Sequence, residues 1–145
     1  MIGDKYPITD ICFTCKDLEA SVSFYRDKIG LKLRRSQEGF ADFTSEHVTV
    51  ALWQLDHIKE HTGVDGHAGD NKTRKAMVAL EVPTPEVVDE IYNDLYAKGV
   101  PFTKPPMNYL WNAYCCYFSD PDGNLWEVYA WVGDGAEGYH ELHRE

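Results

Sequence analysis

Carboxylates and aromatic rings alternate with small residues along segments that have the two-residue period of β-strands. The carboxylates are Asp10, Glu81 and Glu127, and the rings on the same strand faces include Trp53 and Tyr129. A face that merely packs in a core seldom contains three carboxylates, because burying a charge without a partner is costly. We therefore expect these side chains to line a solvent-facing groove or a ligand cavity.

Flat aromatic walls bind planar rings by offset stacking, and a cation over a ring face gains about 0.5–2 kcal/mol. The aromatic-rich stretch 107–114 follows a Pro-Pro pair and is a candidate binding loop. The same rings would also suit a core or a dimer interface, where Trp and Tyr are common. The residues that we expect to bind a ligand are Asp10, Cys12, Trp53, Met77, Tyr109, Trp111, Tyr114, Glu127 and Tyr129.

The four cysteines and six histidines form no strong metal motif. Cys12 and Cys15 have the CxxC spacing, but residues three apart on a strand point to opposite faces. Cys115 and Cys116 also face oppositely, so we expect reduced thiols. We place His47 in a tight turn. The remaining histidines fall in a polar linker or a C-terminal tail: His57, His61, His67, His140 and His143.

The elements that would position these residues occur twice along the chain. In the first copy, a strand over 8–15 precedes a helix that Asp17 caps and Gly30 ends. In the second copy, a strand over 77–82 precedes a helix that Thr84 caps. Three strands are expected after each helix, over 31–35, 40–44 and 48–55 in the first copy and over 101–104, 113–119 and 124–131 in the second.

This repeat predicts the α+β class, with two βαβββ modules that form curved mixed sheets around a cleft and carry helices on the outer face. Alternation places Phe13, Leu80 and Val128 on the faces that the helices cover. The turn 119–123 (SDPDG) is a strong hairpin signal. Within one domain, we assign 7–55 to module 1, 56–74 to the linker, 75–131 to module 2 and 132–145 to the tail.

Two groups of motifs carry a family resemblance over residues 8–131. The first group is ITDI at 8–11 and DLEASVSFYRD at 17–27, followed by Gly30 and Leu31, and the second is FSDPDGNLWE at 118–127. This pattern resembles the vicinal oxygen chelate superfamily, which includes glyoxalase I, bleomycin-resistance proteins, fosfomycin-resistance enzymes and extradiol dioxygenases. The motifs are specific for the superfamily and do not single out a subfamily.

The resemblance implies a divalent-metal site at four matching points, which here are Asp10, Ala51, Met77 and Glu127. Metal enzymes of the family have His or Glu, Glu or Gln, His, and Glu at these points. Glu127 matches and Asp10 is short, whereas Ala51 cannot ligate and Met77 is a poor ligand for hard ions. A working site needs at least three protein ligands and an open position. We therefore expect no metal cofactor, with a divalent ion at an atypical site as the alternative.

The resemblance and the altered ligand points together favour a metal-independent small-molecule-binding protein of the bleomycin-resistance type. Its ligand would be a flat aromatic or cationic compound. The alternative is an enzyme of the family, a lyase, isomerase or ring-opening catalyst, in which Glu127 or Asp10 would act as general base. A module that binds only other proteins fits less well, because the uncovered face contains carboxylates.

The charge balance agrees with this choice. The chain has 24 acidic and 14 basic residues, a net charge of −10. Such acidity opposes nucleic-acid binding and attracts cations, although it also serves solubility. No apolar run reaches the roughly 20 residues that cross a bilayer, and the first residues lack a signal-peptide pattern. We expect a cytoplasmic protein with neither nucleic-acid nor membrane partners.

We also expect a homodimer. Each curved sheet buries only one face in its own module and needs a partner module, either within the chain or across subunits. By the resemblance, such proteins are dimers that bind ligands in grooves between subunits. Sedimentation equilibrium at micromolar concentration should therefore show a species of twice 16.6 kDa. A single 16.6 kDa species would contradict the dimer and leave the fold prediction intact.

Overall fold

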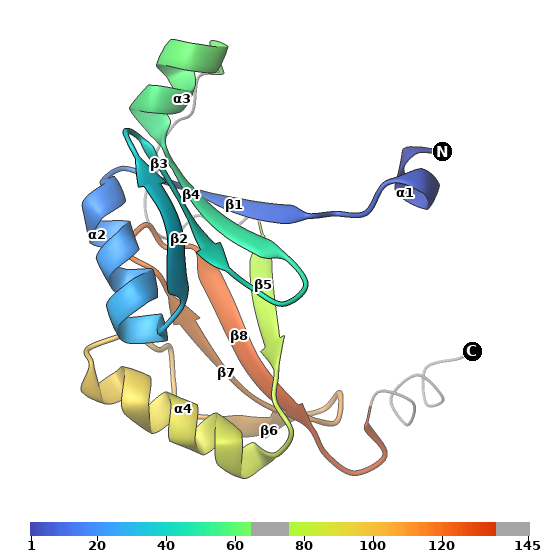
Figure 1. Ribbon diagram of the computed structural model, residues 1–145. Helices are drawn as coiled ribbons and strands as arrows, with labels where there is room; N and C mark the ends of the chain where they lie inside the picture. Colours follow the sequence, from blue (N-terminus) through green and yellow to red (C-terminus); the bar gives the residue numbers. More distant parts are fainter. Residues whose placement is uncertain (65–75, 136–145) are drawn as a thin grey trace. The chain divides into compact units, whose positions relative to one another are not determined.

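The computed structural model describes residues 1–64 and 76–135 of the chain (Figure 1). The chain divides into two compact units, Met1–Thr73 and Arg74–Glu145, and each has its own four-stranded mixed sheet. The predicted α+β class with two mixed sheets is confirmed. None of the helices in the described ranges is both long and apolar enough to cross a membrane.

Unit 1 contains a sheet of strand order β1-β4-β3-β2, in which β1 runs parallel to β4 and the other pairs are antiparallel. Asp17 caps the first long helix by accepting a hydrogen bond from the Ala20 N–H at 3.1 Å. Gly30, with a φ of 86°, ends the following π-helical turns. The elements are α1 (Ile2–Lys5), β1 (Asp10–Cys15), α2 (Leu18–Ser23), η1 (Phe24–Ile29), β2 (Lys32–Gln37), β3 (Phe40–Thr44), β4 (Thr49–Gln54) and α3 (Leu55–Thr62).

Unit 2 repeats this plan with the strand order β5-β8-β7-β6, and β5 runs parallel to β8. Thr84 accepts a hydrogen bond from the Val87 N–H at 3.4 Å, and Pro85 takes the first helical position. Both predicted caps are therefore confirmed. The elements are β5 (Met77–Glu81), α4 (Pro85–Ala97), β6 (Met107–Tyr109), β7 (Ala113–Ser119) and β8 (Leu125–Trp131).

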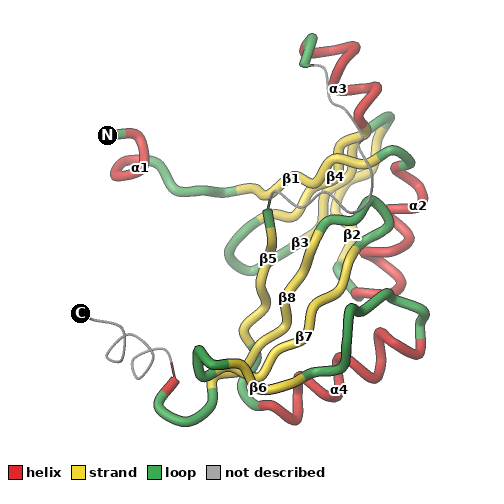
Figure 2. Tube along the Cα trace, turned by 180° about the vertical axis from the view of Figure 1, so that it is seen from behind, coloured by secondary structure: helices red, strands yellow, loops and turns green. Residues whose placement is uncertain are grey.

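One face of each sheet packs against a helix, and the other face, which we call the uncovered face, does not. In unit 1, Phe13 of β1 stacks on Tyr25 of η1 with ring centroids 5.9 Å apart. In unit 2, Trp126 stacks on Phe118 at 6.0 Å, and Val128 is fully buried. Figure 2 shows α4 lying along one side of the strands of its own unit. The alternation of these strands therefore decides which side chains remain on the uncovered face.

The predicted turn between β7 and β8 is organised around Asp120, which is 4% exposed. Its carboxylate accepts hydrogen bonds from the backbone N–H and from the side-chain amide of Asn124, both at 2.8 Å. Gly123 adopts a φ of 81°, a conformation that favours glycine. This turn sets the register in which Tyr117 of β7 lies opposite Glu127 of β8.

Three expectations about the linker and the strands differ from the structure. The first residues of the predicted linker form α3, because Ile58 is buried against the unit and gives the segment an apolar side. The predicted strand 101–104 contributes only a bridge between Phe102 and Phe118, and the edge strand is β6. Leu80 is 39% exposed rather than covered, because α4 packs mainly on β7 and β8 and less on the edge strand β5.

Other expectations fall outside the described residues. These are the structure of the linker from residue 65 to residue 74 and of the tail beyond residue 135. They also include the positions of His67, His140 and His143.

A charged cluster occupies the uncovered face of unit 1. Asp42 is 1% exposed and accepts two hydrogen bonds from Arg34, at 3.0 Å from Nε and 2.7 Å from Nη2. Arg35 donates to the same carboxylate through Nε at 2.9 Å and through Nη2. A β-bulge between Leu33 and Arg35 brings both arginines to one side of β2. The hydrogen bonds from the two guanidinium groups hold the pKa of Asp42 well below its usual range.

Asp42→Asn should lower the free energy of unfolding by about 1–3 kcal/mol, because one amide oxygen cannot balance two guanidinium groups. Both arginine side chains are partly exposed, so solvent screening keeps the loss below that of a fully buried pair. Because folding lowers the pKa of Asp42, the carboxylate contributes its full stabilisation when the pH is above its usual pKa of 3.8. This contribution is lost as the pH falls from 3.8 toward the lowered pKa.

Urea denaturation of the parent and the variant at about pH 7 and about pH 3 measures this effect. The difference between the two proteins should shrink at the lower pH. Glu38→Gln, which changes an exposed carboxylate in the β2–β3 turn, is the control and should change stability by less than about 0.5 kcal/mol. A difference between parent and Asp42→Asn that does not depend on pH would contradict the assigned role of the ion cluster.

Candidate functional site

The uncovered face of unit 2 gathers five side chains that combine carboxylate, phenol and thiol groups. Glu127 and Tyr129 lie at alternate positions of β8, and Glu81 lies beside Tyr129 on β5. On β7, Tyr117 lies opposite Glu127 and Cys115 lies opposite Tyr129. Because residues two apart on a strand share a face, this part of the candidate site follows directly from the register of three strands.

Each carboxylate of this face has a phenol donor on the neighbouring strand. The Tyr117 hydroxyl donates to Glu127, and the Tyr129 hydroxyl donates to Oε2 of Glu81 at 3.3 Å. Burial raises the pKa of Tyr117 well above its usual range, and the hydrogen bond and charge of Glu127 raise it further. The pKa of Tyr129 is raised by burial and by the charge of Glu81. Both phenols therefore keep their protons and act as hydrogen-bond donors to the carboxylates.

Three rings form a continuous aromatic wall, by which we mean Tyr109, Trp111 and Tyr117. The rings of Tyr109 and Trp111 stack with centroids 4.6 Å apart and an interplanar angle of 21°. Tyr117 meets Tyr109 edge-on at 5.9 Å and 90°. All three are only partly buried, so part of the ring surface is open to solvent. A second edge-on pair, Tyr129 and Trp131 at 5.4 Å, lies at the end of β8.

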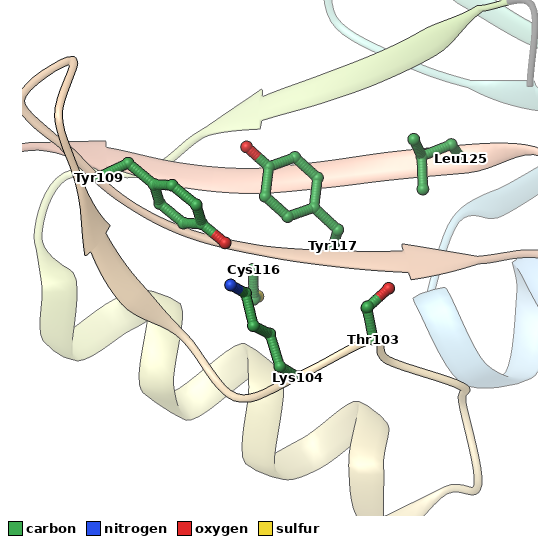
Figure 3. A pocket seen from close by; sticks show the side chains of 6 residues that line it. All are labelled: Thr103, Lys104, Tyr109, Cys116, Tyr117 and Leu125. Carbon is green, nitrogen blue, oxygen red and sulfur yellow. The ribbon is translucent and has the colours of Figure 1, made fainter.

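A pocket of about 310 Å³ opens beside the aromatic wall (Figure 3). It lies along the edge of β7, between the last β6–β7 pair, Met107 with Cys115, and the bridge from Phe102 to Phe118. The Lys104 ammonium is 5.5 Å from the centroid of the Tyr109 ring. The lining residues are Thr103, Lys104, Tyr109, Cys116, Tyr117 and Leu125.

The predicted ligand-binding residues thus fall into two groups, one in each unit. Asp10, Cys12 and Trp53 belong to unit 1, where Asp10 accepts a hydrogen bond from the Thr9 hydroxyl at 2.6 Å and Cys12 is exposed. The Trp53 indole N–H donates to Nδ1 of His57 at 3.0 Å. In unit 2, Met77 lies on β5 and is 47% exposed, and the remaining predicted residues lie on β6, β7 and β8 or in the turn after β6.

Tyr114, one of the expected ligand-binding residues, lies on the covered side of the sheet and apart from the other predicted residues of unit 2. Tyr114 alternates with Cys115 on β7, points to the side that α4 covers, and donates to Oδ1 of Asp89 at 2.6 Å. That hydrogen bond and burial raise its pKa to about 12. The stretch 107–114 is not a continuous loop, because it contains β6, a turn with Asn112 at a φ of 58°, and the start of β7. Tyr114 therefore ties the sheet to its helix.

Sequence reasoning missed several residues of the site, and among them Tyr117 and Lys104 contribute most to its chemistry. Tyr117 could have been predicted, because the strand alternation that places Glu127 on the uncovered face also places Tyr117 opposite it across the β7–β8 turn. Lys104 carried no such signal, since its position depends on a segment that leaves the sheet after Phe102. The prolines that follow Lys104 lack backbone N–H groups and cannot continue a ladder.

The donor atoms at the four points marked by the resemblance do not fit a divalent metal ion. Ala51 has no donor atom and is 3% exposed, and Met77 offers only a thioether. Glu127 already accepts a hydrogen bond from Tyr117. Within the described part of either unit, no three His, Cys, Asp or Glu side chains lie close enough together to hold a metal ion. We therefore assign no metal-dependent step to these residues.

Comparison with known proteins relates this geometry to one superfamily. The family model of the Glyoxalase/Bleomycin resistance protein/Dioxygenase superfamily matches residues 8–128. The uncharacterized Bacillus subtilis protein YraH is 31% identical over 117 residues, which are 78% of this chain and 89% of YraH.

Solved structures agree with this comparison. A crystal structure of a glyoxalase/bleomycin resistance protein/dioxygenase from Nocardioides has 44% identity and a TM-score of 0.84, over 90% of this chain and 87% of that one. A lactoylglutathione lyase from Agrobacterium tumefaciens has 22% identity and a TM-score of 0.69, over 85% of this chain and 92% of that one. At that identity the likeness to the lyase shows the shared fold alone.

The thiols near the site should differ sharply in reactivity. Iodoacetamide at about pH 8 should alkylate native protein at Cys12 before Cys115 or Cys116. Cys12 is exposed, whereas Cys115 and Cys116 are at most 1% exposed and burial raises their pKa to about 11 and about 12. Partial burial also raises the pKa of Cys12, so its alkylation should be slow.

Peptide mapping by mass spectrometry after timed quenching follows each thiol. Protein unfolded in urea is the control, in which all four cysteines should react at similar rates. Modification of Cys115 ahead of Cys12 in native protein would show that the uncovered face of unit 2 opens more readily than its packing indicates.

Proposed function

We propose that this chain, which belongs to the Glyoxalase/Bleomycin resistance protein/Dioxygenase superfamily, is a metal-independent small-molecule-binding protein whose ligand is a flat aromatic compound with a positive charge. One observation carries this proposal. On the uncovered face of unit 2, the aromatic wall lies directly beside Glu127, because Tyr117 belongs to the wall and donates its hydroxyl to that carboxylate.

The aromatic wall supplies the binding surface for a flat ring. Tyr109 and Trp111 already stack on each other, so their planes are held by mutual contact before a ligand arrives. Stacking on such a preformed surface loses little side-chain entropy, which favours affinity. A planar ring of the size of a nucleobase gains about 1–3 kcal/mol of binding free energy when it stacks on an aromatic side chain. A planar ligand on this wall would therefore gain more than one isolated hydrogen bond provides.

The carboxylates supply the preference for positive charge. Tyr117 and Tyr129 orient Glu127 and Glu81 by hydrogen bonds, but a neutral phenol does not cancel a carboxylate charge. The uncovered face of unit 2 therefore keeps negative charge next to polarisable rings, an arrangement that favours cations. The net charge of −10 adds long-range attraction that weakens as salt increases.

Two matched dyes test the proposal by isothermal titration calorimetry: 9-aminoacridine, a planar cation at neutral pH, and acridine, its neutral counterpart. The parent protein should bind the cation more tightly. Trp111→Ala should weaken the binding of both dyes by about 5–100-fold, because it removes one of the stacked rings. Glu127→Gln keeps an acceptor for Tyr117 and should weaken the cation more than the neutral dye.

Two variants serve as controls. Tyr96→Ala removes a 64% exposed ring from α4, and Glu86→Gln removes a carboxylate from the first turn of the same helix. Neither should change binding. Equal binding of the dyes to the parent, Trp111→Ala and Glu127→Gln proteins would place the ligand elsewhere, and the unit 1 variant Trp53→Ala would then be tested. Recovery of a chemically altered ligand would instead favour an enzyme.

A further inference from the structure

The pocket beside the aromatic wall contains a positive charge, whereas the charge next to the wall, that of Glu127, is negative. Of its six lining residues, Lys104 alone is charged, and it is a cation in a strongly acidic protein. Among the described residues, no carboxylate lies within 4.0 Å of its ammonium group, which lies over the Tyr109 ring at 5.5 Å from the centroid. An ammonium group placed at a pocket without a counter-charge has hydrogen-bond donors to offer to a ligand.

Hydroxyl groups add further donors around the same space. Thr103 precedes Lys104 in the segment that borders the pocket, and Figure 3 shows the Lys104 side chain and the Tyr109 hydroxyl extending into it. Tyr117 contributes its ring as a wall, because its hydroxyl is already bonded to Glu127. The pocket therefore offers one positive charge and two hydroxyl donors, while Glu127 lies behind the ring of Tyr117.

We infer that this pocket binds a carboxylate group of the ligand whose ring lies on the aromatic wall. A carboxylate matches the single charge of Lys104 and accepts hydrogen bonds from an ammonium and from hydroxyls. A dianion such as a phosphate monoester would bring a second negative charge close to Glu127, and no second cation lines the pocket. A volume of about 310 Å³ holds a carboxylate with part of its ring and leaves the remainder on the wall.

This inference deepens the proposed function and rests on it for the position of the ring. Together they fix the direction in which the ligand would lie on the wall. Its positive group lies on the Glu127 side of Tyr117, and its carboxylate lies on the Lys104 side. A flat amphoteric molecule would satisfy both sides at once, whereas a simple cation uses only one of them.

Two probes separate the inference from the proposed function. Benzoate has a ring and a carboxylate but no positive charge, and 9-aminoacridine-4-carboxylate adds a carboxylate to the dye used above. In calorimetry, the carboxylated dye should bind the parent about tenfold more tightly than 9-aminoacridine, the gain expected for a charge-assisted hydrogen bond. Benzoate should bind weakly, because it has no positive group for Glu127 and the net negative charge of the protein opposes an anion.

Lys104→Met should remove the tenfold advantage of the carboxylated dye and weaken benzoate by a similar factor. 9-Aminoacridine should bind this variant at least as tightly as the parent, because a positive charge that repels it is removed from the Tyr109 ring. Thr103→Val, which keeps the side-chain shape, should cost about two- to fivefold for both carboxylates. Lys5→Met removes the same charge from α1 in unit 1 and should have no effect. Circular dichroism of each variant confirms that the fold is retained.

The outcomes are distinguishable. Lys104-dependent binding of benzoate without any binding of 9-aminoacridine would support the carboxylate pocket and contradict the proposed cation preference. Binding of 9-aminoacridine with no gain from the added carboxylate would overturn the pocket and leave the proposed function standing. Carboxylate binding that Lys104→Met does not weaken would also overturn the inference.

Discussion

On a sheet that a helix covers on one side, neighbouring strands can supply hydrogen-bond partners to the polar side chains of the other side. The two units together do this for three carboxylates, each of which accepts hydrogen bonds from donors on a neighbouring strand. The pairs are Asp42 with Arg34 and Arg35, Glu127 with Tyr117, and Glu81 with Tyr129. Because a shift of one residue would turn every partner to the wrong face, these pairs depend on strand register. The Asp120 turn and the bulge in β2 are therefore as important to the two faces as the charged groups themselves.

The two units differ in the kind of donor, and the difference decides what each face can do. In unit 1 the donors are cations, so the charge of Asp42 is more than cancelled and its carboxylate is 1% exposed. In unit 2 the donors are neutral phenols, which hold the carboxylates in place and leave their charge available. The uncovered face of unit 1 is therefore stabilised from within. The uncovered face of unit 2 keeps the negative charge of its carboxylates beside the aromatic wall, and Lys104 lines the pocket on the other side of Tyr117.

Local signals in the sequence were sufficient for most of the fold. The caps at Asp17 and Thr84 and the turn at 119–123 depend on residues that are neighbours in the chain, and all three are present as predicted. The site was harder to predict. Treating 107–114 as a loop discarded the alternation that separates Tyr114 from the uncovered face. The convergence of two arginines on Asp42 needs a bulge, which a strict two-residue period does not contain, and Lys104 reaches the pocket only through tertiary packing.

The bulge in β2 also ties the length of that strand to the chemistry of its neighbour. The extra residue between Leu33 and Arg35 allows two successive guanidinium groups to share one side of the strand. Deleting this residue, Arg34, would restore a regular ladder with Arg35 still opposite Asp42, but the carboxylate would keep one guanidinium partner instead of two. If Asp42 were replaced by an apolar residue, the extra residue would no longer have this role. The length of β2 and the charge at position 42 are thus coupled, because the second guanidinium that the extra residue supplies has a partner only while position 42 carries a carboxylate.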